Sequence, residues 1–159
     1  MRNLIYVLFA GLALMLSACG GNTKDAELTN TKASFPASFN FPKLGLKVIT
    51  SSINKKRGTM STLYGNQLAF SNLATRNKVA PGEILALVTW KQQADQHWFG
   101  ANIPGDLQSI EMIKTTPGVG SAAVNYQRFE RKDLNLNEDT LGRQARIKDI
   151  FGMKPSIMP

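Results

Sequence analysis

The chain has 159 residues and carries 19 Lys or Arg against 11 Asp or Glu, which gives a formal net charge of +8. This length suits a single domain with its own hydrophobic core. Only one cysteine is present, which excludes an internal disulfide and the paired cysteines that attach c-type haem. The basic residues are scattered and lack the aromatic or glycine-rich patterns of RNA-binding segments, so no nucleic acid is expected as a partner.

The N-terminus has the layout of a bacterial lipoprotein signal peptide. A short basic start precedes an apolar run from Leu4 to Leu16, and residues 16–19 read Leu-Ser-Ala-Cys, which resembles a lipobox. The run is shorter than the ~20 apolar residues that span a bilayer. We therefore expect residues 1–18 to be removed as a signal peptide and Cys19 to carry the lipid that anchors the protein. The alternative is an ordinary signal peptide in which the cysteine has no such role.

Residues 19–43 are polar, contain two prolines and show no sustained apolar period, which predicts a lipidated N-terminus and a tether. Phe35, Phe39 and Phe41 predict that the end of this tether packs on the domain, which is expected to span residues 44–159. Residue 20 is glycine rather than the aspartate that retains some lipoproteins at an inner membrane. We therefore expect a lipid-anchored protein of the bacterial cell envelope, with the outer membrane favoured over the inner one.

The domain begins with the pattern of a β-hairpin. Residues 46–50 are rich in β-branched side chains, residues 54–58 have turn chemistry, and residues 59–64 read as the returning strand. Asn66 then predicts the cap of a short helix that runs to about Arg76, because the apolar residues of this segment fall on one helical side.

Residues 83–90 form a nearly unbroken apolar run, which predicts a central strand buried on both faces. Two further strands are expected at residues 107–115 and 122–129, and Asn137 is the candidate cap of a C-terminal amphipathic helix. This order predicts an α+β fold, in which an antiparallel β-sheet of about five strands carries a short helix after the first hairpin and a C-terminal helix packed on it.

The sequence lacks the residue patterns of common catalytic sites. A Ser-His-Asp triad would need His97, the sole histidine, and the chain has no Gly-x-Ser-x-Gly elbow. Glu138 and Asp139 are adjacent and fit the first turn of a helix. The glycine-rich residues 118–123 lead into a predicted strand rather than the helix that a dinucleotide site requires. The inventory favours a protein without catalysis, since oxidoreductase chemistry would require bound haem, and no catalytic residue is assigned.

The most unusual segment is residues 90–100, which holds both tryptophans, a phenylalanine, a lysine and the only histidine. Trp90, Trp98 and Phe99 fit the walls of a ligand pocket with His97 and Lys91 as its polar groups. A neutral imidazole can ligate haem iron or another metal, so His97 is the candidate metal ligand. The alternative is that Trp98 and Phe99 fill the core and that His97 lies at a loop with its ring hydrogen-bonded.

Four strings together resemble the cytochrome P-460 family, and lipoproteins assigned to it in particular. They are Thr-Met-Ser-Thr-Leu-Tyr-Gly-Asn at 59–66, Pro-Gly-Glu-Ile-Leu-Ala-Leu-Val-Thr-Trp-Lys at 81–91, His-Trp-Phe-Gly-Ala at 97–101 and Ser-Ile-Glu at 109–111. The resemblance covers about residues 44–129. It implies a compact antiparallel sheet with flanking helices, shared with cytochrome c-prime-beta, and a haem held against the sheet.

The resemblance does not extend to the haem attachment. Well-studied members of the family attach haem through Cys-x-x-Cys-His near the C-terminus, and the hydroxylamine-oxidising type adds a lysine cross-link. Residues 146–159 contain neither cysteine nor histidine, and Lys91 is not matched to the cross-linking lysine. The resemblance therefore implies the fold but no covalent haem.

Three hypotheses for function remain. The first is a membrane-tethered, non-catalytic binding module without covalent haem. The second is a protein that holds b-type haem non-covalently through His97, with Met112 or a water on the opposite side, for redox or gas-ligand chemistry. The third is a haem-free structural domain that docks a partner through its sheet and basic surface. The expected partners are the membrane, through the lipid, and a small ligand or an envelope protein.

Overall fold

The computed structural model describes residues 30–36, 39–75, 78–130, 135–137 and 142–156. The predicted signal peptide and Cys19 lie outside these residues. A compact unit spans Thr31–Pro159. This unit includes residues 31–43, which the sequence pattern assigns to the tether.

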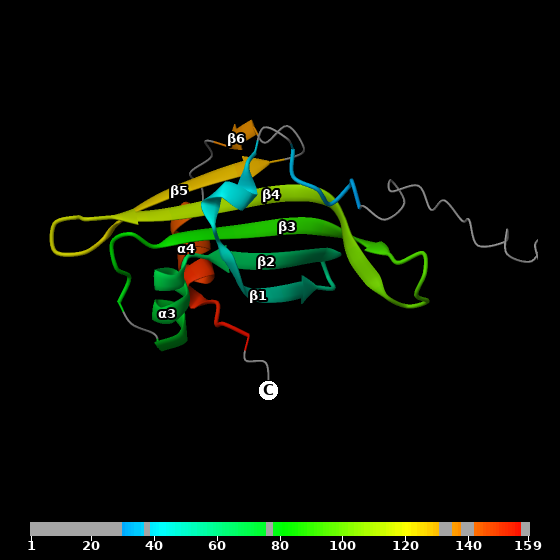
Figure 1. Cartoon of the computed structure of the whole chain (residues 1–159), viewed down its shortest axis with the longest axis horizontal. Helices are drawn as coiled ribbons and strands as arrows, with labels where there is room; N and C mark the ends of the chain where they lie inside the picture. Colours follow the sequence, from blue (N-terminus) through cyan, green and yellow to red (C-terminus); the bar gives the residue numbers. More distant parts are fainter. Residues whose placement is uncertain (1–29, 37–38, 76–77, 131–134, 138–141, 157–159) are drawn as a thin grey trace, which may run out of the picture. The chain divides into compact units, whose positions relative to one another are not determined.

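Within the described residues, six antiparallel strands form one sheet and lie side by side in sequence order (Figure 1). They are β1 (Lys47–Asn54), β2 (Thr59–Gly65), β3 (Ile84–Ala94), β4 (Asn102–Thr116), β5 (Ala123–Glu130) and β6 (Asn135–Asn137). The helices are η2 (Phe41–Leu44), a short 3-10 helix, with α3 (Gln67–Thr75) and α4 (Arg143–Gly152). The predicted α+β class is confirmed, with α3 after the first hairpin and α4 near the C-terminus. The strand beyond the expected five is β6, which has only three residues.

The β3–β4 hairpin is longer than predicted. The two strands remain paired as far as Ala94 and Asn102, with irregular register around Trp90. The extension is mostly polar and includes Pro104. Sequence periodicity missed it because these residues lack the apolar pattern of a buried strand.

The C-terminal helix begins later than predicted, and the expected role of Asn137 as its cap is wrong. Asn137 pairs with Arg128 in the β5–β6 ladder. α4 begins at Arg143, after Gly142 with a φ of 76°. Glycine adopts this left-handed conformation without the steric cost that a side chain would bring.

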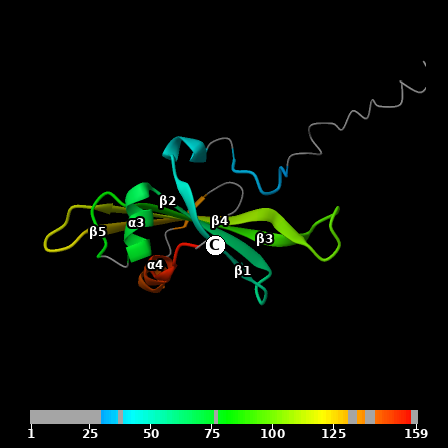
Figure 2. The same cartoon turned by 60° about the horizontal axis from the view of Figure 1, so that its bottom comes forward.

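β3 is buried on both faces, as its apolar run predicts. Side chains alternate between the two faces of a strand. Leu85 and Leu87 therefore belong to one apolar cluster, whereas Ala86 and Val88 belong to the other, and each of the four is at most 2% exposed. We call the first side the helix face and the second the N-terminal face. Figure 2 shows α4 on one side of the sheet and η2 on the other.

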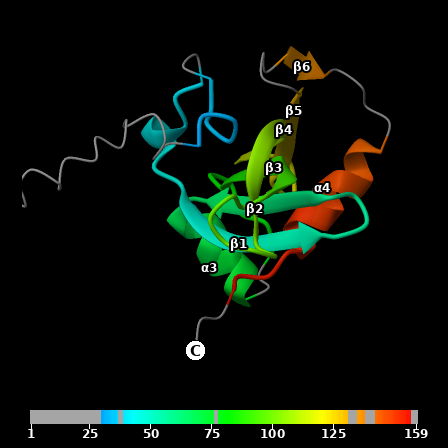
Figure 3. The ribbon, with the colours of Figure 1, turned by 90° about the vertical axis from the view of Figure 1, so that its right-hand side faces the viewer.

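The helices α3 and α4 cover part of the helix face. Leu73 of α3 and Ile150 of α4 pack on the strands there. The predicted cap of α3 is confirmed, since Oδ1 of Asn66 accepts a hydrogen bond from the N–H of Ala69 at 3.0 Å. After α4 the chain runs along β1 (Figure 3), where the N–H of Ser156 donates to the carbonyl of Ile49 at 3.0 Å.

Residues 33–36 and 39–46 cover the N-terminal face, and the predicted packing of the three phenylalanines on the domain is confirmed. Phe41 is 8% exposed; its ring stacks on that of Phe35 at 4.6 Å between centroids and meets Tyr64 edge-on at 4.9 Å. The indole N–H of Trp90 donates to the carbonyl of Ala33 at 2.9 Å. This segment is therefore the second layer of the domain.

We predict that Phe41→Ala lowers the free energy of unfolding by about 3–5 kcal/mol, the usual cost of truncating a buried phenylalanine. Urea denaturation followed by circular dichroism measures the loss. Phe99→Ala is the matched control, because Phe99 is 110% exposed and its truncation should change stability by about 0.5 kcal/mol or less. Equal stability of both variants would mean that the segment around Phe41 is a tether and not a layer of the core.

Candidate functional site

The structure does not bring the sequence-predicted site residues together. Trp90 is 7% exposed under the N-terminal segment, whereas Trp98 is 73% and Phe99 110% exposed in the β3–β4 turn. His97 and Lys91 are exposed as well, and the backbone N–H of His97 donates to Oδ1 of Asp95 at 2.8 Å. The aromatic pocket expected from these residues therefore does not form. The alternative in which Trp98 and Phe99 fill the core is wrong too.

The residues present do not fit haem. His97 lies in an exposed turn, whereas Met112 is 5% exposed on the N-terminal face and pairs with Ala86 within the β3–β4 ladder. Axial ligands must approach one iron from opposite sides of the haem plane, and these two side chains occupy separate environments. Among the described residues, no group of three His, Cys, Asp or Glu side chains is placed to hold a metal ion. We therefore derive no chemistry through haem or a metal.

A polar cleft of about 270 Å³ lies on the helix face, beside the part that the helices cover. Three arginines line it, together with one glutamate and a set of hydroxyl side chains. The arginines are Arg57, Arg128 and Arg146, and the glutamate is Glu111. We call this site the arginine cleft. Its ionisable lining carries a net charge of +2.

Hydroxyl groups form the floor of the arginine cleft. Ser61, Thr89 and Ser109 stand opposite one another on β2, β3 and β4, because directly paired residues of antiparallel strands face the same side. Oγ of Ser61 and Oγ1 of Thr89 are 3.0 Å apart and share a hydrogen bond. The helix face thus changes along β3 from leucine at Leu85 and Leu87 to a row of hydroxyls.

Glu111 is the buried charge of the cleft. It is 2% exposed; Oε1 accepts from the hydroxyl of Tyr126 at 2.5 Å and from Nε of Arg146 at 3.0 Å, and Oε2 accepts from Nη2 of Arg146 at 2.5 Å. Burial alone would raise the pKa of Glu111, but the hydrogen bonds from Arg146 and Tyr126 outweigh it and hold the pKa below its ordinary value. Burial and the bond to Glu111 raise the pKa of Tyr126 to about 12.

Arg128 lies next to Glu111 in the β4–β5 register and is not fully paired. Nη2 of Arg128 contacts Oε1 of Glu130 at 2.8 Å, but Nε is buried and has no hydrogen-bond partner among the described residues. Nε of Arg143 is likewise buried without a partner, but the guanidinium of Arg143 lies over the ring of Tyr126, 6.0 Å from its centroid, where cation–π attraction offsets the loss. A buried N–H without an acceptor costs about 1–3 kcal/mol. In the arginine cleft, the Nε–H of Arg128 is such a group, and it lacks a hydrogen-bond acceptor in the described part of the chain.

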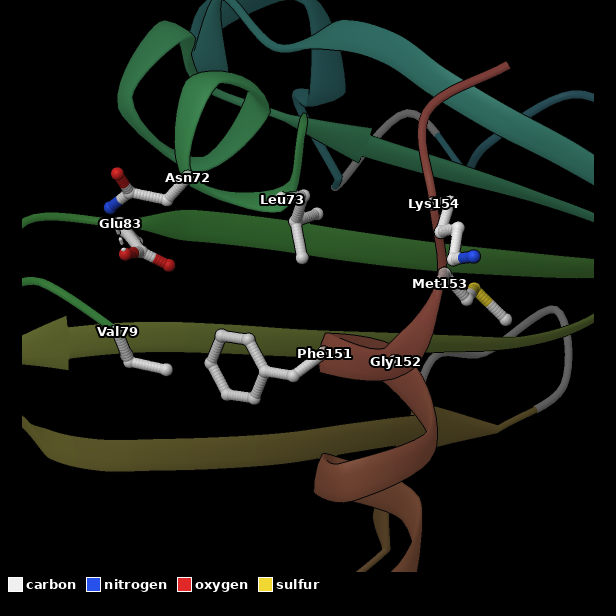
Figure 4. A pocket seen from close by; sticks show the side chains of 8 residues that line it. All are labelled: Asn72, Leu73, Val79, Glu83, Phe151, Gly152, Met153 and Lys154. Carbon is white, nitrogen blue, oxygen red and sulfur yellow. Dashed lines mark hydrogen bonds between the residues drawn. The ribbon is translucent and has the colours of Figure 1, made fainter. Parts of the chain in front are cut away.

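A second cavity of about 380 Å³ lies between α3 and the end of α4 (Figure 4). The apolar part of its wall is formed by Leu73, Val79, Phe151 and Met153. Glu83 lies at one end and Lys154 at the other (Figure 4). Glu83 is 1% exposed, and its Oε1 accepts from Nδ2 of Asn72 and from the N–H of Ala80, both at 2.6 Å. This carboxylate therefore holds the connection between α3 and β3, and we assign it a structural role.

No protein-family model and no curated protein matches the chain. The resemblance to the cytochrome P-460 family stays a prediction. In the part of the chain that the structure describes, no helix is long and apolar enough to cross a membrane.

Sequence reasoning missed the arginine cleft. Its clearest signal was Glu111, an acidic residue within the apolar residues 110–113 of a predicted strand, where a charge is costly unless it is paired. The partners were not predictable, because Tyr126 and Arg146 lie 15 and 35 positions along the chain. Arg128 carried no signal of its own, because the basic residues are scattered along the sequence.

We predict that Glu111→Gln lowers the free energy of unfolding by about 1.5–3 kcal/mol at neutral pH, the usual worth of hydrogen bonds to a charged group. The folded-state pKa of Glu111 is below its ordinary value of 4.5, so its contribution is present above pH 4.5 and is lost as the pH falls through the folded pKa. The stability difference between wild type and variant should therefore shrink in acid. Thermal unfolding of both proteins between pH 7 and pH 2 measures it, and a difference independent of pH would contradict the assignment.

Proposed function

We propose that the protein is a lipid-anchored binding module of the bacterial envelope that holds a small anionic solute in the arginine cleft, without catalysing a reaction. The observation that carries the proposal is the buried Nε of Arg128, which has no hydrogen-bond acceptor among the described residues. A carboxylate or phosphate oxygen is the acceptor that a guanidinium binds best, because the bond is charge-assisted. The bound anion would restore the hydrogen bond that the fold leaves unmade.

The charge and shape of the cleft support a small anion as the ligand. Glu111 is paired with Arg146 and Glu130 with Arg128, so Arg57 supplies the positive charge that an anion would meet, and Arg128 adds the N–H of its Nε. The hydroxyls of Ser61, Thr89 and Ser109 can donate or accept, and they suit the remaining oxygens of a phosphate or a short hydroxy acid. A volume of about 270 Å³ is slightly below the ~300–1,000 Å³ of pockets for drug-sized ligands. The ligand is therefore small and polar.

The absence of a catalytic pair among the residues lining the cleft supports a binding role. The described lining contains hydroxyls but neither histidine nor lysine, the bases that usually activate a hydroxyl nucleophile. Glu111 is committed to Tyr126 and Arg146 and is held in its ionised form. These groups can bind and orient an anion, and none is free to move a proton at neutral pH.

Binding is tested with inorganic phosphate and with succinate, by titration of the purified protein while the NMR signal of Arg128 Nε–H is followed. We expect this signal to shift on saturation, and we expect Arg128→Gln to weaken binding by about 10-fold or more, the worth of a hydrogen bond between charged groups. Lys148→Gln removes the same charge from an exposed position on α4 and should bind as wild type does. An Arg128 signal indifferent to both anions, or equal weakening in both variants, would refute the cleft as the site.

The anchor in this proposal is Cys19, through the lipobox-like residues 16–19. We predict that Cys19→Ala abolishes lipid attachment and processing before residue 19. Metabolic labelling with a palmitate analogue and fractionation of the cells measure both. Multiple acyl chains anchor firmly, so detergent rather than salt should release the wild-type protein. A variant that is still cleaved at the same bond and still partitions with membranes would show that the lipoprotein assignment is wrong.

A further inference from the structure

Two exposed aromatic side chains lie at the tip of a long arm of the sheet. β2 pairs with β3 only as far as Lys91, and β5 pairs with β4 only as far as Ser109. Beyond these points β3 and β4 continue as a two-stranded ribbon that pairs as far as Ala94 and Asn102 (Figure 1). The turn that closes this ribbon holds Trp98 and Phe99. We call residues 92–106 the arm.

The exposure of these aromatics has no explanation within the domain. Trp98 is 73% and Phe99 110% exposed, so the fold gains almost no burial energy from either side chain. Adjacent exposed aromatics on a narrow tip expose apolar surface to water at a cost of ~25 cal/mol per Å². Tryptophan in particular prefers the interface between lipid headgroups and acyl chains, because its ring is apolar and its N–H is polar.

A cluster of positive charge lies at the base of the arm. The β1–β2 turn carries Lys55, Lys56 and Arg57, all exposed, and Lys91 is exposed on β3 opposite Thr59. The turn is tied to the arm by a backbone hydrogen bond of 2.8 Å from the N–H of Gln92 to the carbonyl of Gly58. The strand residues 92–94 separate this cluster from the turn at the tip, a distance of about 10 Å.

Acidic side chains do not cancel this charge. The carboxylates on the arm are Asp95, whose Oδ1 accepts the N–H of His97, and Asp106. Within residues 55–57 and 91–106, four cations are therefore accompanied by only two carboxylates. Each basic residue close to an anionic membrane surface contributes ~1 kcal/mol of attraction, and that attraction fades within a Debye length of about 10 Å.

We infer that the arm is a second membrane contact, in which Trp98 and Phe99 insert into the interface of an anionic phospholipid surface while Lys55, Lys56, Arg57 and Lys91 meet its headgroups. The placement of the tether supports this occupant. The chain enters the fold at Ala33, whose carbonyl is bound by Trp90 near the start of the arm. If Cys19 is lipidated as proposed, residues 20–30 allow at most about 40 Å between the lipid and the domain. The arm would then fix the orientation of the domain on the membrane.

Fluorescence quenching tests this inference with the lipidated wild-type protein, reconstituted into vesicles of phosphatidylcholine with or without phosphatidylglycerol and with brominated acyl chains as quenchers. The chain has two tryptophans, so Trp98→Phe leaves only the buried Trp90. We expect brominated lipid to quench wild type in anionic vesicles and not to quench Trp98→Phe. Quenching that is equal in the two proteins, or absent from both, would overturn insertion of the tip.

The charge of the cluster is tested by the double variant Lys55→Glu and Lys56→Glu, which leaves Arg57 in the arginine cleft. We expect its quenching in anionic vesicles to fall to the level of neutral vesicles. The double variant Lys114→Glu and Lys148→Glu makes the same change of charge at exposed positions elsewhere and should be quenched as wild type is. Equal loss in both double variants would overturn the role of the cluster.

The outcome is separable from that of the proposed function. Flotation of the protein with neutral vesicles reports the lipid anchor, whereas quenching of Trp98 reports the arm. Protein that floats with vesicles but is not quenched would retain the anchor and refute the arm. Protein that does not float with neutral vesicles, yet floats with anionic ones and is quenched there, would support the arm and refute the anchor. Anion binding by Arg128 is measured without any lipid.

Discussion

β3 has to be covered on both sides, and the architecture of the domain follows from that requirement. Its residues from Leu85 to Val88 are apolar without interruption and at most 2% exposed. Such a strand is stable only between two layers. The chain provides the layers from its two ends, with α4 on the helix face and residues 33–36 and 39–46 on the N-terminal face. The segment that leads to the membrane in our proposal is therefore also part of the core.

The cover on the helix face is incomplete, and this incompleteness creates the arginine cleft. Where the helices stop, the strands change from leucine to hydroxyl and charged side chains, which do not need an apolar layer. The pair of Glu111 and Arg146 lies at the border, tied to β5 by Tyr126 and to α4 by the arginine itself. Replacement of a buried ion pair by apolar residues is often neutral for stability. The presence of the Glu111–Arg146 pair therefore suggests that the polar face has a function. The proposed binding of an anion is such a function.

The features that could be predicted from the sequence are those that depend on residues close together in the chain. They are the buried strand β3, the hairpin before it and the helix cap at Asn66. The cleft could not be predicted, because its residues come from all of β1 to β5, from the β1–β2 turn and from the C-terminal helix, and they meet only through strand register and helix packing. The aromatic residues 90–99 were misread for a related reason. Trp90 and Trp98 are close in sequence, which suggested a shared pocket. Trp90 lies within the β3–β4 ladder, whereas Trp98 lies in the turn at the tip of the arm.

The hydrogen bond between Trp90 and Ala33 has a mechanical consequence. If the lipid at Cys19 holds the protein, a pulling force on the domain enters the fold at Ala33 rather than at a strand end. The load would then fall on the stacked rings of Phe35 and Phe41, which attach by side-chain contacts and can detach one after another. The β-ladders, whose hydrogen bonds would have to break together under shear, would bear the load later. Under tension the N-terminal layer would peel away first, and the sheet would remain paired while its second face came into contact with water.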